Sequence, residues 1–230
     1  MFDYLLDKEY SIDYYQWNLF IDNNKLNIDS LCEQIIQKND PSLACFFAID
    51  HQYQLHKMQK IVLDSNNAKY AFLFAKMINS ADINALQQIV IKSNNINYLT
   101  KFACFIPKSN IKLLENLIYK SNKIKYIHTL FLNNKNINFN KYKKYILSCN
   151  NPKYLFELSR HIDNDKDIIK IQDAIIASGS AKYIRMFASK IKNVNISKLE
   201  EAILSTNNIK EIKKFAKLVK NSSMKNFLIV

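Results

Sequence analysis

The chain has 230 residues, of which 48% are hydrophobic and 23% are charged, so it is long and apolar enough for a globular domain and is not intrinsically disordered. It contains one Gly and three Pro, too few for the tight turns and phosphate-binding loops of Rossmann, P-loop and α/β-hydrolase proteins, or for a many-stranded sandwich. The formal net charge is +13. The composition predicts an all-α, basic protein.

The N-terminal segment MFDYLLDKEYSIDYYQW carries acidic residues where a secretory signal peptide needs basic ones, and no run of eighteen apolar residues occurs. The cysteines lack CxxC spacing, which disfavours both a disulfide framework and a zinc site; they are Cys32, Cys45, Cys104 and Cys149. We therefore expect a cytoplasmic protein with reduced thiols and no membrane contact.

The sequence repeats with a period of 28 residues and slips of one residue. The clearest unit, SNNAKYAFLFAKMINSADINALQQIVIK, spans residues 65–92, and the following unit begins SNNINYLTKFACF. The other units are recognised by the same pattern; they begin at Ser93, Ser121, Cys149, Ser178 and Thr206, with weaker copies near Tyr10 and Lys38. That makes eight starts, of which the last unit is truncated.

Within a unit the apolar residues fall at helical spacing in two clusters, so each unit predicts two short helices. Side chains that can cap the first helix recur at Asn67, Asn95, Asn151, Ser180 and Asn208, and caps for the second helix recur at Asp82, Asn110 and Asn195. A small residue recurs where neighbouring helices would approach closely: Ala48, Ala75, Ala103, Ala188 and Ala216.

Two helices of about ten residues cannot bury their own apolar face, so the units must stack. The sequence predicts an α-solenoid of two-helix repeats, with the architecture of HEAT and TPR arrays, forming one domain over residues 1–230. We expect an aromatic, acidic N-terminal cap and first repeat over 1–37, central repeats over 38–205, and a truncated repeat and cap over 206–230. Trp17 and the tyrosines around it are interpreted as cap residues, the alternative being an aromatic surface that binds a partner.

Charge is distributed unevenly along the chain. Residues 1–64 hold ten acidic side chains and five Lys, a net charge of −5, whereas residues 65–230 hold 28 basic and ten acidic side chains, a net charge of +18. Residues 65–148 alone carry +11. An AT-rich genome favours Lys codons, but Asp and Glu also have AT-rich codons and are frequent before residue 65, so codon bias does not explain the asymmetry.

One set of lysines occupies the fifth position of successive repeats, with Asn97 interrupting it, and we call it the lysine ladder: Lys69, Lys125, Lys153, Lys182 and Lys210. The position lies in the first turn of a helix, where a cation is mildly unfavourable against the helix dipole, so helix stability does not explain Lys there. We predict that the ladder binds phosphates or an acidic protein face, with Lys101 and Arg185 as further binding residues. The alternative is that the ladder is inherited from repeat duplication and only solvates the edge. The tyrosines that follow it are expected to pack in the core.

No enzymatic site is predicted. None of the four histidines pairs at the spacing of a metal site, and the series Asp163, Asp165 and Asp167 lacks the glycine and distal Glu of a calcium loop, so it is interpreted as a capped, solvated connection. Cys45 with His51, or Cys149 with His161, has no spacing that supports a nucleophile and base. We expect no metal and no cofactor, with a helical-repeat DNA repair glycosylase as the remaining enzymatic alternative.

The segment KYIRMFASKIKNVNISKLEEAIL, residues 182–204, resembles short two-helix repeat arrays of phages and large DNA viruses of low-GC hosts. The resemblance covers roughly residues 10–220 and implies a viral or mobile-element protein acting in the host cytoplasm. It also implies an inhibitor of host defence, such as an anti-CRISPR protein, binding an acidic protein or nucleoprotein. Direct, sequence-tolerant RNA or DNA binding is the alternative, although Arg and exposed aromatic residues, which usually accompany it, are scarce.

Overall fold

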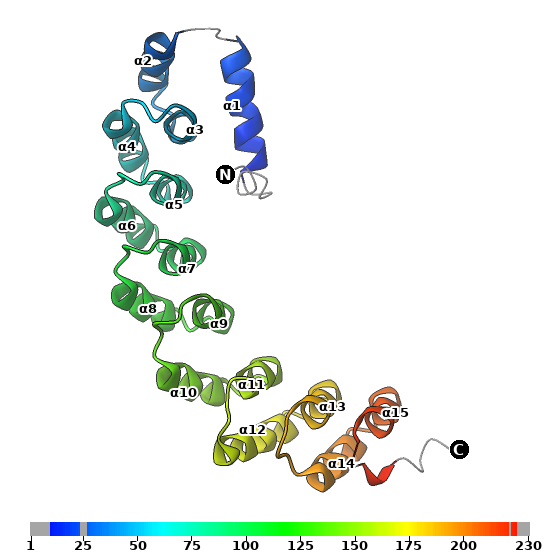
Figure 1. Ribbon diagram of the computed structural model, residues 1–230. Coiled ribbons are helices and arrows are strands. Elements are labelled where there is room, and N and C mark those ends of the chain that lie inside the picture. The colour runs from blue at the N-terminus through cyan, green and yellow to red at the C-terminus, as the bar shows by residue number, and fades with distance from the viewer. Residues whose placement is uncertain (1–9, 24–26, 221, 225–230) are drawn as a thin grey trace. The chain divides into compact units, whose positions relative to one another are not determined.

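The computed structural model describes residues 10–23, 27–220 and 222–224, and in these ranges the chain forms α-helices and no β-strand (Figure 1). The predicted all-α repeat fold is thus confirmed. No helix in these ranges is long and apolar enough to cross a membrane. The helices are α1 (Ser11–Asn23), α2 (Ile28–Lys38), α3 (Pro41–His51), α4 (Leu55–Asp64), α5 (Ala68–Met77), α6 (Ile83–Lys92), α7 (Ile96–Phe105), α8 (Ile111–Lys120), α9 (Ile124–Asn133), α10 (Phe139–Cys149), α11 (Pro152–Ser159), α12 (Asp165–Ala177), α13 (Ala181–Lys190), α14 (Ile196–Ser205) and α15 (Ile209–Leu218).

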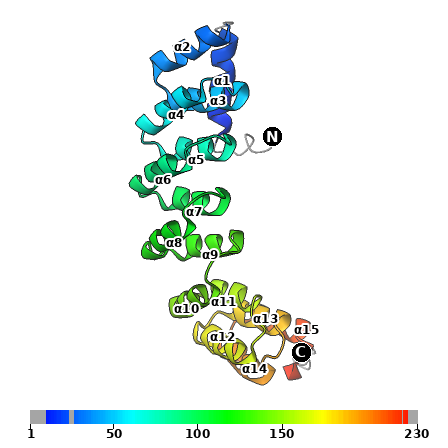
Figure 2. The ribbon, with the colours of Figure 1, turned by 60° about the vertical axis from the view of Figure 1, so that its left-hand side comes forward.

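The described residues form two compact units that divide between Lys135 and Asn136, and each is considered by itself. Within each unit the helices form two layers (Figures 1 and 2). The first helices of the repeats, which we call A helices, are α3, α5, α7 and α9 in the first unit and α11, α13 and α15 in the second; the remaining helices from α2 onward are B helices. Within each unit, neighbouring A helices pack against each other, and α3, α5, α7, α11 and α13 also pack against the B helix that follows them.

The predicted 28-residue period is confirmed by the starts of the A helices. From α5 to α15 these helices begin 28 or 29 residues apart, at Ala68, Ile96, Ile124, Pro152, Ala181 and Ile209. The single 29-residue step falls between α11 and α13, where α12 is 13 residues long. One extra residue is therefore absorbed in the second helix of that repeat.

A short turn with one residue in the left-handed conformation joins each B helix to the next A helix. At the best example, Ser65 Oγ donates to the carbonyl of Val62, Asn66 takes the left-handed conformation with φ 51°, and Asn67 begins the next helix as its N-cap. Asn tolerates this conformation better than other residues that carry a Cβ. The equivalent left-handed residues are Asn39, Asn94, Asn122, Asn150 and Asn207, and the one Gly of the chain, Gly179, with φ 65°.

Most of the predicted caps are confirmed. Asn67, Asn95, Asn151 and Asn208 accept hydrogen bonds from first-turn amides of A helices, and Asp82, Asn110 and Asn195 do so for B helices. The prediction for Ser180 is wrong, because its side chain accepts no such bond. The position that Asn67 occupies holds Lys123 at α9, which also has no side-chain cap.

The core lies between the layers and follows the repeat. The equivalent residues Phe74, Phe102 and Phe187 are fully buried. All five alanines of the small-residue position are buried as well, as a position between packed helices requires. The core of each unit is therefore a series of equivalent layers, as expected for stacked repeats.

A glutamine or glutamate on several B helices connects consecutive repeats. Gln87 Oε1 accepts a hydrogen bond of 2.7 Å from the backbone N–H of Asn110, the N-cap of the following B helix, and Gln172 accepts one of 2.8 Å from Asn195. Gln59 makes the same contact with Asp82 at 2.9 Å. Gln87 and Gln172 are both buried. Each accepts from a backbone N–H of the following repeat and so joins two repeats while satisfying a backbone donor.

Glu200 occupies the equivalent place near the end of the second unit. It accepts hydrogen bonds of 2.6 Å from Ser222 Oγ and from the backbone N–H of Ser223. Burial opposes ionisation of Glu200, but the hydrogen bonds from these two serines outweigh it and lower the pKa of the carboxyl group. Residues 225–230, part of the predicted C-terminal cap, lie outside the described residues.

The N-terminal helix departs from the repeat. In Figure 1, α1 runs along the stack of the first unit, whereas the neighbouring A helices are seen end-on. Trp17 is fully buried against Phe47 of α3 and donates a hydrogen bond of 2.7 Å to Asp50, which supports the cap interpretation. Tyr15 is exposed, and residues 1–9, the start of the predicted cap, lie outside the described residues.

Candidate binding surface

Every lysine of the ladder is the second residue of an A helix, directly after the turn that joins two repeats. At Lys69 and Lys153 the backbone N–H is held by the N-cap asparagine, Asn67 at 3.0 Å and Asn151 at 3.1 Å. The turn thus fixes the backbone of the first helical turn. Its recurrence in each repeat places the ladder side chains at equivalent points of successive A helices.

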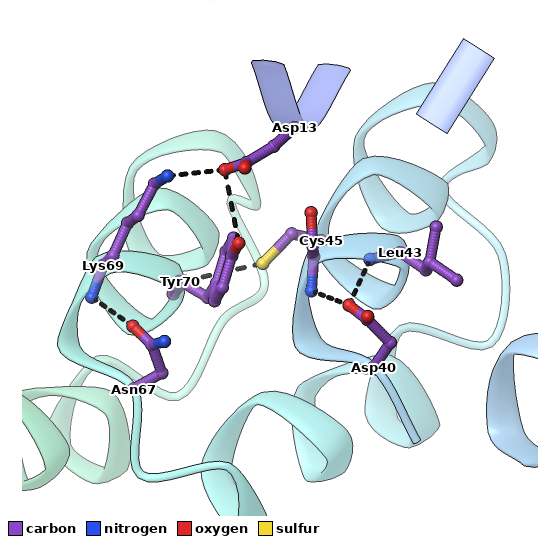
Figure 3. A network of polar contacts seen from close by, with 8 residues as sticks. Asp13, Asp40, Leu43, Cys45, Asn67, Lys69 and Tyr70 are labelled. Carbon is purple, nitrogen blue, oxygen red and sulfur yellow. Dashed lines mark hydrogen bonds and ion pairs between the residues drawn. The ribbon is translucent and has the colours of Figure 1, made fainter. Parts of the chain in front are cut away.

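The structure pairs the first member of the ladder with a carboxylate of α1. Lys69 Nζ lies 2.6 Å from Asp13 Oδ2, and the hydroxyl of Tyr70 donates to the same oxygen at 3.2 Å (Figure 3). The ammonium group also lies 5.1 Å from the ring centre of Tyr10 and 5.5 Å from that of Tyr70. Burial, together with the charge of Asp13, raises the pKa of Tyr70 to about 12, so its hydroxyl remains a donor.

The other four ladder lysines are exposed, and no carboxylate of the described residues forms an ion pair with any of them: Lys125, Lys153, Lys182 and Lys210. Three of these ammonium groups lie over the ring of the following tyrosine, at 5.7 Å for Tyr126, 5.5 Å for Tyr154 and 5.5 Å for Tyr183. The tyrosines were expected in the core. Tyr154 is buried, whereas Tyr70, Tyr126 and Tyr183 are half-buried at the edge of the A layer.

The two further predicted binding residues have contacts within the fold. Lys101 is half-buried, with its ammonium 5.2 Å from the ring centre of Tyr98. A cation therefore lies near the ring of Tyr98 although Asn97, and not a lysine, precedes it. Arg185 Nε lies 2.6 Å from Glu211 of the neighbouring helix α15, with 15% of its side chain exposed. Hydrogen bonds from Arg185 and Lys214 lower the pKa of the Glu211 carboxyl group. The resulting carboxylate neutralises the charge of Arg185 between two A helices.

Most carboxylates between Ser65 and Lys220 have partners of their own. Asp82 caps α6, and Asp167, Asp173 and Glu211 form ion pairs with Lys143, Lys198 and Arg185. Few acidic groups therefore remain to balance the lysines of this region. The A layers carry uncompensated positive charge at the four exposed ladder positions; exposed lysines also occur on B helices, at Lys112, Lys144, Lys166 and Lys170.

Sites for metal or nucleophilic chemistry are not apparent in the described part of the chain. It contains no cluster of three or more His, Cys, Asp or Glu side chains that could hold a metal ion. The acidic series lies at the start of α12, where Asn164 caps the helix and Asp167 pairs with Lys143, in agreement with a capped connection. Burial raises the pKa of Cys45 far above its ordinary value and that of Cys104 to about 11, so both thiols are neutral and poorly nucleophilic.

Several shallow grooves lie where consecutive repeats meet. One, of about 470 Å³, lies beside α5 and α7 and is lined by Lys76, Phe105 and Lys108. Phe105 is 46% exposed, and the Lys76 ammonium lies 5.3 Å from its ring centre. This pair was not predicted from the sequence, because Phe105 stands at an apolar position of the helix; the available signal was the two lysines that flank it in sequence, Lys101 and Lys108.

Comparison with models of protein families, with curated proteins and with solved structures finds no match.

Proposed function

We propose that this protein is a non-enzymatic binding protein whose A-helix surface binds an acidic protein partner through the lysine ladder. The observation that carries the proposal is an exposed ammonium group that recurs at the same point of α9, α11, α13 and α15 and has no ion-pair partner among the described residues. These unpaired ammonium groups add little to the stability of the fold, since even a surface ion pair contributes only about 0–1 kcal/mol. An acidic partner would compensate them and be attracted over a distance.

An acidic protein fits the surface better than a nucleic acid does. Proteins that bind single strands combine positive charge with exposed aromatic rings on which bases stack, and with arginine. Among the described residues of the A layers, Phe105 is the one aromatic side chain that is largely exposed, and Arg185 is neutralised by Glu211. The viral origin and the inhibition of a host-defence nucleoprotein, which the repeat resemblance implies, belong to this proposal as the biological setting.

A titration with two polyanions tests the proposal. Poly-L-glutamate represents an acidic protein, and an oligodeoxythymidylate of equal charge represents a nucleic acid. The test variant replaces Lys125, Lys153, Lys182 and Lys210 by Gln; the matched control replaces four exposed lysines of B helices, Lys112, Lys144, Lys166 and Lys170. Both variants lose four charges and should fold, because exposed substitutions change stability by about 0.5 kcal/mol or less each.

We expect the ladder variant to bind poly-L-glutamate at least about tenfold more weakly, since each lost contact contributes up to about 1 kcal/mol, and the control variant to lose clearly less. Equal losses in the two variants would contradict the proposal, because net charge alone would then explain binding. Stronger binding of the oligonucleotide, with a shallower dependence of affinity on salt in the ladder variant, would favour the nucleic-acid alternative.

A further inference from the structure

The pairing of Lys69 and Tyr70 with Asp13 is an occupied example of an arrangement that recurs in the chain. A lysine at the second residue of an A helix is followed by tyrosine in α5, α9, α11 and α13. The distance from the ammonium to the ring centre is 5.5 Å, 5.7 Å, 5.5 Å and 5.5 Å in these helices, so the ammonium lies nearly equally close to the ring in all four pairs. In α5 the pair holds a carboxylate, as Figure 3 shows.

We propose that each exposed Lys–Tyr pair at the start of an A helix binds one carboxylate of an acidic helix of the partner, in the way that Lys69 and Tyr70 bind Asp13. This inference rests on the proposed function and specifies how the partner is recognised. The ammonium supplies charge, and the phenolic hydroxyl supplies a directed hydrogen bond to the same oxygen. The N-terminal end of the A helix adds a favourable dipole, which accounts for a site at this position.

Two of the pairs have the required groups available. The hydroxyls of Tyr126 and Tyr183 have no hydrogen-bond partner in the described part of the chain, and both rings are half-buried, which limits their motion. Lys125 and Lys182 beside them are exposed and have no ion-pair partner there. A carboxylate that arrives from outside therefore displaces no internal contact.

The occupant of the first site indicates the kind of partner. Asp13 lies on α1, a helix that runs along the stack and not across it. In the second unit, Lys153 of α11 and the Lys182–Tyr183 pair of α13 lie on neighbouring helices, whose axes in such packing are about 8–10 Å apart. Carboxylates seven residues apart on a partner helix are separated by about 10.5 Å along one face. A helix lying along the stack, as α1 does, thus has the spacing to reach the α13 pair with one acidic residue and the Lys153 ammonium with another.

Replacement of tyrosine by phenylalanine tests the inference, because it removes the hydroxyl but keeps the charge of the lysine and the ring beneath it. The test variant carries Y126F and Y183F, and the control carries Y15F, which changes an exposed tyrosine without a ladder lysine. Binding of poly-L-glutamate and of an oligodeoxythymidylate is measured for the full chain. We expect poly-L-glutamate to bind the double variant about tenfold more weakly, from the loss of two hydrogen bonds to charged oxygens, and the control to be unchanged.

The outcomes separate this inference from the proposed function. If the ladder variant binds poly-L-glutamate weakly but the double tyrosine variant binds like the parent protein, the inference is overturned and the proposed function stands. If the tyrosine changes weaken only oligonucleotide binding, the sites recognise phosphate and the carboxylate assignment is overturned. If poly-L-glutamate does not bind the parent protein at low salt, both proposals fail.

Discussion

Replacing Gln87 by Met removes the side-chain acceptor that joins the repeats containing α6 and α8. Met has a similar length and flexibility but no strong acceptor, so the backbone N–H of Asn110 loses its 2.7 Å hydrogen bond. Gln87 is 3% exposed, but Asn110 is exposed, so water can reach the donor that loses its partner. We therefore expect the free energy of unfolding to fall by about 0.5–1.5 kcal/mol, the net contribution of one hydrogen bond.

The neighbouring residue provides a matched control. Gln88 lies on the same helix but is exposed, so Gln88→Met should change stability by about 0.5 kcal/mol or less. Urea denaturation measures the loss, and hydrogen exchange shows whether protection is lost at the Asn110 amide first. Equal stability of the two variants, with the Asn110 amide still protected in Gln87→Met, would refute the role assigned to the buried glutamines.

Three further predictions concern the core, the occupied site and acid stability. Phe102→Ala should lower the free energy of unfolding by about 3–5 kcal/mol in urea denaturation, because Phe102 is fully buried; a loss below about 1 kcal/mol would contradict its core position. A double-mutant cycle of Asp13→Asn and Lys69→Gln should give a coupling energy of about 0.5–3 kcal/mol, whereas additive effects would show that the pair does not form. The pKa of Glu200 is lowered from its ordinary value of 4.5, so the ionised carboxylate stabilises the fold fully above pH 4.5, and this stabilisation is lost as the pH falls toward the lowered pKa. In acid titrations the Glu200→Gln variant should therefore lose less stability than the parent protein over that pH interval.

The repeat and most helix boundaries could be predicted because they depend on local sequence. An asparagine that caps a helix bonds to an amide two or three residues away, so Asn67 and Asp82 could be assigned from spacing alone. The cap at Ser180 failed although Ser is a suitable residue type. The turn does not explain the difference, because Ser178 Oγ accepts from the backbone N–H of Ser180 just as Ser65 Oγ accepts from that of Asn67, whose cap forms. The difference lies in the orientation of the Ser180 side chain itself, which spacing along the sequence does not specify.

The occupied site could not be predicted because its partners are distant in sequence. Asp13 and Lys69 are separated by 56 positions, and their contact depends on the direction in which α1 leaves the stack. That direction follows from the burial of Trp17 against α3, which is a tertiary contact. The contacts of the buried glutamines could have been predicted, since Gln87 and Gln172 stand at the same repeat position, which Glu115 also occupies, on an otherwise apolar face. A polar residue recurring there was a signal of a contact between repeats.

The most direct test of the proposed binding surface is a comparison of lysine reactivity with and without an acidic ligand. The full chain is treated with a lysine-acylating reagent, alone and with saturating poly-L-glutamate, and modification of each lysine is measured by mass spectrometry. We expect poly-L-glutamate to protect Lys125, Lys153 and Lys182 strongly from acylation and to change the acylation of the exposed B-helix residues Lys112 and Lys144 little. Equal protection of both sets would contradict this expectation, because the ligand would then bind wherever the protein is positively charged.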